Sequence, residues 1–161
     1  MLRRRLDERR VPAEITSAGF VTEDRPASPP AVDLLAGRGM DLRAHRSQRV
    51  TADHLGAPDL ILCMERMHVR EIAVLDREAF ERTFTLPDLA RRVEAHGPRR
   101  EGEGVRDWLR RIGAGRRPAD VLGIAAEDEV PDPYGRPAAA DRRTAETLDD
   151  LLDGVVSHLF P

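Results

Sequence analysis

The strongest constraint on the fold is the continuous apolar run Leu-Ile-Leu-Cys-Met at residues 60–64. Runs that are apolar at successive positions are typical of strands buried on both faces, as in parallel sheets. Residues 65–75 follow with helical spacing of the apolar side chains Val69, Ile72 and Leu75. A buried strand followed by an amphipathic helix indicates an α/β fold with a parallel sheet.

Helical and strand-like patterns alternate along the rest of the chain. The last predicted helix is amphipathic and would turn six side chains inward, namely Leu148, Leu151, Leu152, Val155, Val156 and Leu159. Proline and glycine predict loops at 21–30, 96–104 and 130–137. We expect helices at 2–10, 31–38, 105–112 and 138–159, helix starts near Asp53 and after Pro87, and strands at 13–19 and 83–86.

The composition excludes several classes of protein. A length of 161 residues suits one domain. The net charge of −3 argues against bulk electrostatic binding to nucleic acid. All 26 cationic residues are arginine, and the interleaved acidic residues favour solvated, ion-paired helix faces. The single cysteine, Cys63, excludes an internal disulfide framework and a multi-cysteine zinc site, and the histidines show no metal-ligand spacing.

The sequence shows no signal for membrane insertion or export. No apolar run approaches the ~20 residues of a membrane-spanning helix. Residues 1–8 lack the apolar stretch of a secretory signal. We therefore expect a cytoplasmic protein with no membrane partner.

Four segments, taken in order along the chain, carry a resemblance to a known family. They are Ile-Thr-Ser-Ala-Gly at 15–19, the Gly-Met-Asp-Leu and His-Arg-Ser stretches within 30–48, Asp-Leu-Ile-Leu-Cys-Met-Glu at 59–65, and Val-Pro-Asp-Pro-Tyr-Gly at 130–135. Together they make the chain resemble the low-molecular-weight protein-tyrosine-phosphatase family.

The resemblance implies a three-layer, Rossmann-like fold of the phosphotyrosine phosphatase I type, with helices on both faces of a parallel sheet. It covers roughly residues 2–86 and 128–160. The sheet's first, central strand has no counterpart in this chain. We expect a single domain over 1–161, with a family-atypical insertion at about 88–126.

The family's chemistry, as the resemblance implies, uses a thiolate nucleophile, a phosphate-binding Cys-x5-Arg-Ser loop and a general acid, without metal or organic cofactor. The loop is absent from these 161 residues. Cys63 cannot replace it, because a Cys-x5-Arg motif that begins at Cys63 needs arginine at position 69, which is Val69, and Arg70 lies one residue too far. Cys63 is therefore expected to be a buried structural cysteine.

Asp132 matches the family's general acid, and the prolines on both sides would fix the backbone and aim its side chain. The alternative is a loop that merely leads into the last helix. Tyr134 would lie at the mouth of the substrate pocket, or else anchor the loop on the core. Ser17 and His45 match residues that brace the phosphate loop, although His45 could equally be a solvent-facing loop histidine.

We therefore expect a family member that is inactive as given, most simply because a misplaced start codon removed its N-terminus. With an intact N-terminus its partner would be a phosphotyrosine protein or a small phosphomonoester. The alternative is a non-catalytic pseudophosphatase that binds or regulates. An arsenate reductase ranks lower, because that chemistry needs further thiols. The sequence leaves homo-oligomerisation open.

Overall fold

The computed structural model describes residues 1–161 and divides into two compact units. The helical unit comprises 1–50 and 132–149, and the sheet unit comprises 51–131 and 150–161. The expected α/β class with a parallel sheet is confirmed, although the sheet has only two strands.

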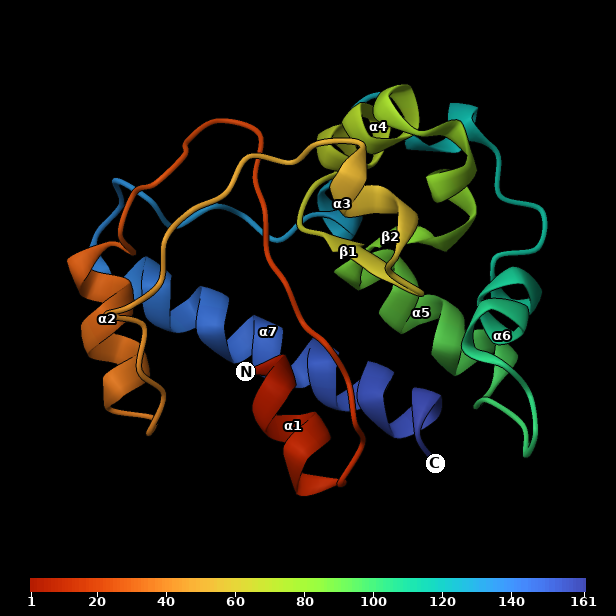
Figure 1. The fold of residues 1–161 in the computed structure, drawn as a ribbon, viewed down its shortest axis with the longest axis horizontal. Helices are drawn as coiled ribbons and strands as arrows, with labels where there is room; N and C mark the ends of the chain where they lie inside the picture. The colour runs from red at the N-terminus through yellow and green to blue at the C-terminus, as the bar shows by residue number, and fades with distance from the viewer. The chain divides into compact units, whose positions relative to one another are not determined.

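The parallel sheet forms where the apolar run predicts it. Strand β1 (Ile61–Cys63) pairs with β2 (Thr83–Thr85), with Leu62 opposite Phe84. Helix α4 (Arg66–Leu75) and the 3-10 helix η1 (Arg77–Arg82) provide the crossover between them. Figure 1 shows the two strands side by side. All three residues of β2 are buried, which explains its unbroken β-branched and aromatic sequence.

Helix α5 (Leu86–His96) continues directly from β2. Thr85 caps the start of this helix, because its hydroxyl accepts a hydrogen bond from Asp88 N at 3.2 Å. Gly97 caps the end, with a φ of 79° that favours glycine. Helix α6 (Val105–Ile112) packs against α5. The sheet unit also contains the short helices α3 (Asp53–Gly56), η2 (Pro118–Val121) and η3 (Ala126–Asp128).

The helical unit contains α1 (Leu2–Glu8), α2 (Pro29–Ala36) and the first part of α7 (Ala138–Leu159). Ser28 caps α2 by accepting a hydrogen bond from Ala31 N at 3.4 Å. Within this unit, Arg5 and Arg38 both pair with Asp149, at 3.0 Å and 2.5 Å. These pairs connect α1, and the turn that follows α2, to α7.

The predicted strand at 13–19 is not a strand in the structure. Most of this segment is exposed, and only Gly19 forms an isolated parallel bridge, with Arg49. Gly19 N donates to Gln48 O at 2.8 Å, and Val50 N donates to Gly19 O at 2.9 Å. A strand requires a neighbouring backbone along its length, and here only its last residue has one.

The last helix agrees with its predicted pattern. Leu152, Val155, Val156 and Leu159 are buried, whereas Leu148 and Leu151 are half-buried. None of the helices combines the length and the hydrophobicity that crossing a bilayer requires.

Trp108 should contribute heavily to the stability of the sheet unit, because it is fully buried and its indole N–H donates to Gly97 O at 3.3 Å. We expect Trp108→Ala to lower the free energy of unfolding in urea by about 3–5 kcal/mol. The control is Ile124→Ala, since Ile124 is 87% exposed and its loss should change little. Equal effects of the two substitutions on circular-dichroism unfolding curves would contradict this packing.

Candidate functional site

Asp132 lies in a proline-rich loop between η3 and α7. Its Oδ1 accepts a hydrogen bond from Tyr134 N at 2.9 Å, and Arg136 N donates to Pro133 O at 3.0 Å. Gly135 completes the turn with a φ of 73°. The loop therefore holds the exposed Asp132 carboxylate in a defined local turn that engages one of its oxygens.

Tyr134 follows Asp132 in the same turn. Its side chain is 80% exposed, so it does not anchor the loop on the core. The aromatic ring is available to a molecule that approaches the loop.

Ser17 and His45 lie on two segments that backbone hydrogen bonds join. Ser17 precedes the bridge of Gly19 with Arg49, and His45 precedes an antiparallel bridge of Arg46 with Pro26. Ser17 is exposed and His45 is half-buried.

All four candidate residues, Asp132, Tyr134, Ser17 and His45, belong to the helical unit. The turn joins Asp132 to Tyr134, and no hydrogen bond links that pair to Ser17 or His45. No group of three or more His, Cys, Asp or Glu side chains is arranged to hold a metal ion.

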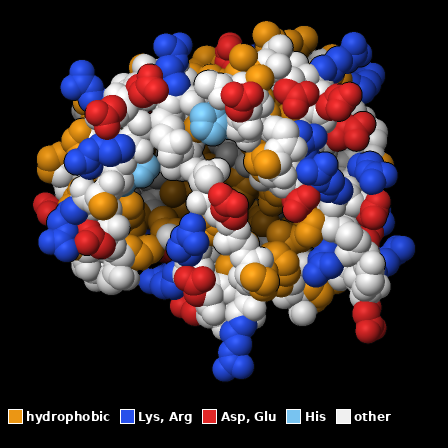
Figure 2. Space-filling view, in the orientation of Figure 1, with side chains coloured by type: hydrophobic (Ala, Val, Ile, Leu, Met, Phe, Trp, Pro, Cys, Tyr) orange, Lys and Arg blue, Asp and Glu red, His pale blue; other side chains and the backbone are white.

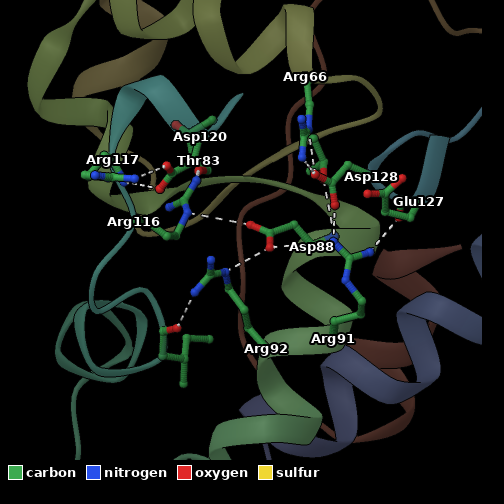
Figure 3. Close-up of polar contacts among 12 residues, drawn as sticks. Arg66, Thr83, Asp88, Arg91, Arg92, Arg116, Arg117, Asp120, Glu127 and Asp128 are labelled. Atoms are coloured by element: carbon green, nitrogen blue, oxygen red, sulfur yellow. Dashed lines mark hydrogen bonds and ion pairs between the residues drawn. The ribbon is translucent and has the colours of Figure 1, made fainter. Parts of the chain in front are cut away.

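Sequence reasoning missed the residues that fix the start of the Asp132 loop. Asp128, which is 6% exposed, accepts a hydrogen bond from Arg66 Nε at 2.6 Å and pairs through its other oxygen with Arg91. Arg91 also donates to Glu127 O at 2.6 Å, as Figure 3 shows. Val130 N donates to Met64 O at 2.8 Å, immediately after β1. Residues 127–130 are thus attached to α4, α5 and the end of β1.

The charge of Asp128 depends on these arginines. Burial acts to raise the pKa of its carboxyl, but the hydrogen bonds from Arg91 and Arg66 outweigh burial and leave the pKa lowered. The ionised carboxylate is therefore the form that the folded chain stabilises.

A second carboxylate, Asp88, lies near several arginines of the same network (Figure 3). Arg92 Nε donates to it at 2.9 Å, and Arg116 Nε lies 3.6 Å away. Arg116 stacks on the ring of Phe84, with its guanidinium carbon 3.8 Å from the ring centroid, and donates to Thr83 O at 2.7 Å. Burial lowers the pKa of Arg116 to about 10.

The expectation of solvated arginine faces is therefore only partly correct. Blue and red side chains are interspersed on the face shown in Figure 2, as it predicts. Arg5 and Arg116, however, have side chains that are only 6% and 5% exposed. Adjacent arginines form no apolar periodicity, so the sequence does not indicate which arginine of a neighbouring pair has a buried side chain.

Cys63 is a buried thiol at the end of β1, as expected. Burial raises its pKa to about 12, although the charge of Arg116 acts in the opposite direction. Such a thiol is not a nucleophile near neutral pH.

Comparisons with known proteins support one family. The family model described as low molecular weight phosphotyrosine protein phosphatase matches residues 1–98. The chain is 40% identical over 59 residues to the probable low molecular weight protein-tyrosine-phosphatase EpsP of Ralstonia nicotianae, a match over 36% of this chain and 41% of that relative. It is 29% identical over 101 residues to the low molecular weight protein-tyrosine-phosphatase Etp of Escherichia coli, over 62% and 68% of the two chains.

The fold is also similar to solved structures. The low molecular weight protein tyrosine phosphatase of T. tengcongensis superimposes with a TM-score of 0.71 at 25% identity. That superposition covers 98% of this chain and 86% of the other.

Cys63 should be protected from modification in the native protein. With a pKa of about 12, only about one thiol in ten thousand is ionised at mildly alkaline pH. We expect Ellman's reagent to react at least about a hundredfold more slowly with the native chain than with the chain unfolded in urea. Equal reaction rates would show that the thiol is accessible and ionised.

Asp128 should make stability depend on pH. Its lowered pKa means that the carboxylate stabilises the fold above the unfolded value of about 3.9, and that this stability is lost as the pH falls further. We expect Asp128→Asn to destabilise the chain at neutral pH by roughly 2–3 kcal/mol, with a smaller difference below pH ~4.

The matched control is Asp107→Asn, which removes an exposed pair with Arg110 and should change little. Urea unfolding at several pH values measures both variants. A difference between Asp128→Asn and the parent chain that stays constant down to strongly acidic pH would contradict the role of the carboxylate charge.

Proposed function

Because the chain belongs to the low molecular weight protein-tyrosine-phosphatase family, we propose that it forms the acid-bearing part of a phosphomonoester hydrolase, with Asp132 as the general acid. The observation that carries this assignment is the local turn at Asp132, in which Tyr134 N donates to Asp132 Oδ1 at 2.9 Å. An acid must be held within hydrogen-bond reach of the leaving oxygen, and such a loop supplies that order.

Asp132 would donate its proton to the departing oxygen as the bond to phosphorus breaks. A phenol has a pKa of about 10, so its anion leaves slowly unless it is protonated. Tyr134, which is 80% exposed beside the acid, would contact the aromatic ring of the substrate. Ser17 and His45 would hold the phosphate-binding loop by hydrogen bonds.

We propose that the 161-residue chain does not hydrolyse phosphomonoesters by itself. The sequence contains no Cys-x5-Arg motif, and its only thiol is buried with a pKa of about 12. Catalysis by the family's chemistry would require a chain that also contains a Cys-x5-Arg-Ser loop. The substrate would then be a phosphotyrosine protein or a small phosphomonoester in the cytoplasm.

The second candidate is a pseudophosphatase that binds a partner without catalysis. The observation that favours it is that the Asp132 loop forms a defined turn although the 161 residues contain no Cys-x5-Arg nucleophile motif. An arsenate reductase ranks below both, because Cys63 is the only cysteine and it is buried. Translation of the upstream DNA separates the first two candidates, since an in-frame stop codon just before Met1 would exclude the missing loop.

The rate of phosphomonoester hydrolysis tests the proposal. The 161-residue chain should hydrolyse p-nitrophenyl phosphate no faster than buffer, whereas the product extended through an upstream Cys-x5-Arg-Ser motif should be active. In that product, Asp132→Ala should lower kcat by about a hundredfold or more with phenyl phosphate. The loss should be smaller with p-nitrophenyl phosphate, because its more acidic phenol leaves with less help from an acid.

Glu146→Ala is the control, because it removes an exposed carboxylate on α7, outside the Asp132 loop, and should leave kcat unchanged. An Asp132→Ala enzyme that lost the same factor on both substrates would show that Asp132 is not the proton donor.

A further inference from the structure

The sheet unit contains a cavity of about 830 Å³ to which the proposed phosphatase chemistry assigns no role. Residues of α4, η1, α6 and η2 line it, and none of the candidate residues Asp132, Tyr134, Ser17 and His45 is among them. A volume of this size lies within the range of sites that hold small organic ligands.

Much of the cavity wall is apolar. Phe80 and Leu109 come from the core, whereas Val74 and Leu122 belong to the exposed apolar surface and are 83% and 63% exposed. Exposed apolar side chains that converge on one concavity mark a binding surface more often than isolated ones do. The wall therefore suits a ligand with an apolar body.

The charges in the cavity are mostly positive. Arg70, Arg77, Arg110 and Arg116 line it, against the single acidic residue Glu81. Arg70 donates to the carbonyl oxygens of Val121 and Gly123, at 2.8 Å and 3.0 Å, so its charge has no carboxylate there. Arg110 already pairs with Asp107 at 2.8 Å, so an anionic group that enters the cavity meets an excess of positive charge from the other three guanidinium groups.

Arg116 is the innermost of these charges, with a side chain that is only 5% exposed. Its carboxylate partner, Asp88, lies 3.6 Å from its Nε and also accepts the shorter hydrogen bond of Arg92, at 2.9 Å. Arg91 also lies 3.8 Å from Asp88, so three cations share this one carboxylate. Asp88 therefore neutralises the charge of Arg116 only in part, and a bound anion would offset the rest.

We propose that this cavity binds an amphipathic organic anion, with an aliphatic or aromatic body against Phe80, Val74 and Leu122 and an anionic head beside the arginines. None of the lining residues belongs to the Asp132 loop, so binding to this cavity can be tested whether or not the chain catalyses phosphate hydrolysis.

The test uses the 161-residue chain with 8-anilinonaphthalene-1-sulfonate as the fluorescent probe. Trp108 is the only tryptophan and precedes Leu109 in the cavity wall, so bound probe should quench its emission by energy transfer. We expect saturable binding of one probe per chain. Decanoate should displace the probe, whereas decanol and decyltrimethylammonium should not at the same concentration.

Two kinds of variant locate the site. Arg77→Glu reverses an exposed charge at the cavity and should weaken probe binding by about fivefold or more. Ala73→Phe adds apolar volume to the wall without changing charge and should weaken binding to a similar degree. Arg100→Glu, the matched control, makes the same charge change on an exposed residue outside the cavity and should leave affinity unchanged.

Each variant is compared with the parent chain in its urea unfolding midpoint, because partly unfolded chains also bind this probe. If Ala73→Phe does not fold, Arg110→Glu, another exposed lining residue, replaces it. Equal displacement by decanoate and decyltrimethylammonium, or affinity unchanged by Arg77→Glu, would overturn the proposal. It would also be overturned if decanoate failed to bind and the same variants abolished a concentration-dependent dimer, because the cavity would then be a protein interface.

Discussion

Two carboxylates of the sheet unit, Asp88 and Asp128, each form ion pairs with arginines from different elements. Asp128 joins Arg66 of α4 to Arg91 of α5, and Asp88 joins Arg92 of α5 to Arg116, which follows α6. The chain has no lysine, and the planar guanidinium can bind a carboxylate, a carbonyl and an aromatic ring at once. Arg116 makes all three contacts. Such multiple contacts of the arginines fix residues 127–130 and part of the cavity wall in a unit whose sheet has only two strands.

Much of the fold could be predicted from the sequence where apolar periodicity is strong. The run at 60–64 predicted strand β1, in which Cys63 is buried and Ile61 and Leu62 are half-buried. The leucines and valines near the C-terminus predicted the buried side of α7. The Val-Pro-Asp-Pro-Tyr-Gly segment gave an ordered loop because prolines and glycine fix their own backbone angles. In each of these places, local chemistry and tertiary packing favour the same conformation.

The sequence could not predict features that depend on a distant partner. Residues 13–19 have the composition of a strand, but only Gly19 finds a neighbouring backbone, with Gln48 and Val50. Arg116 stands between Gly115 and a second arginine, a context typical of a solvated charge. Its burial depends on contacts with Phe84 and Asp88, which are distant in the sequence. The attachment of residues 127–130 likewise depends on Arg66 and Arg91, which lie far away in the sequence. Pairing across such separations leaves no local pattern.

The central proposal is that Asp132 is a general acid in a chain whose 161 residues contain no Cys-x5-Arg nucleophile motif. Intact-mass spectrometry of the chain, quenched in acid during incubation with p-nitrophenyl phosphate, tests it most directly, because a cysteinyl-phosphate intermediate would add one phosphoryl group. The account predicts an unchanged mass for the 161-residue chain and a phosphorylated species for a chain that contains the Cys-x5-Arg-Ser loop. A phosphoryl adduct on the 161-residue chain, at Cys63 or at any other residue, would contradict it.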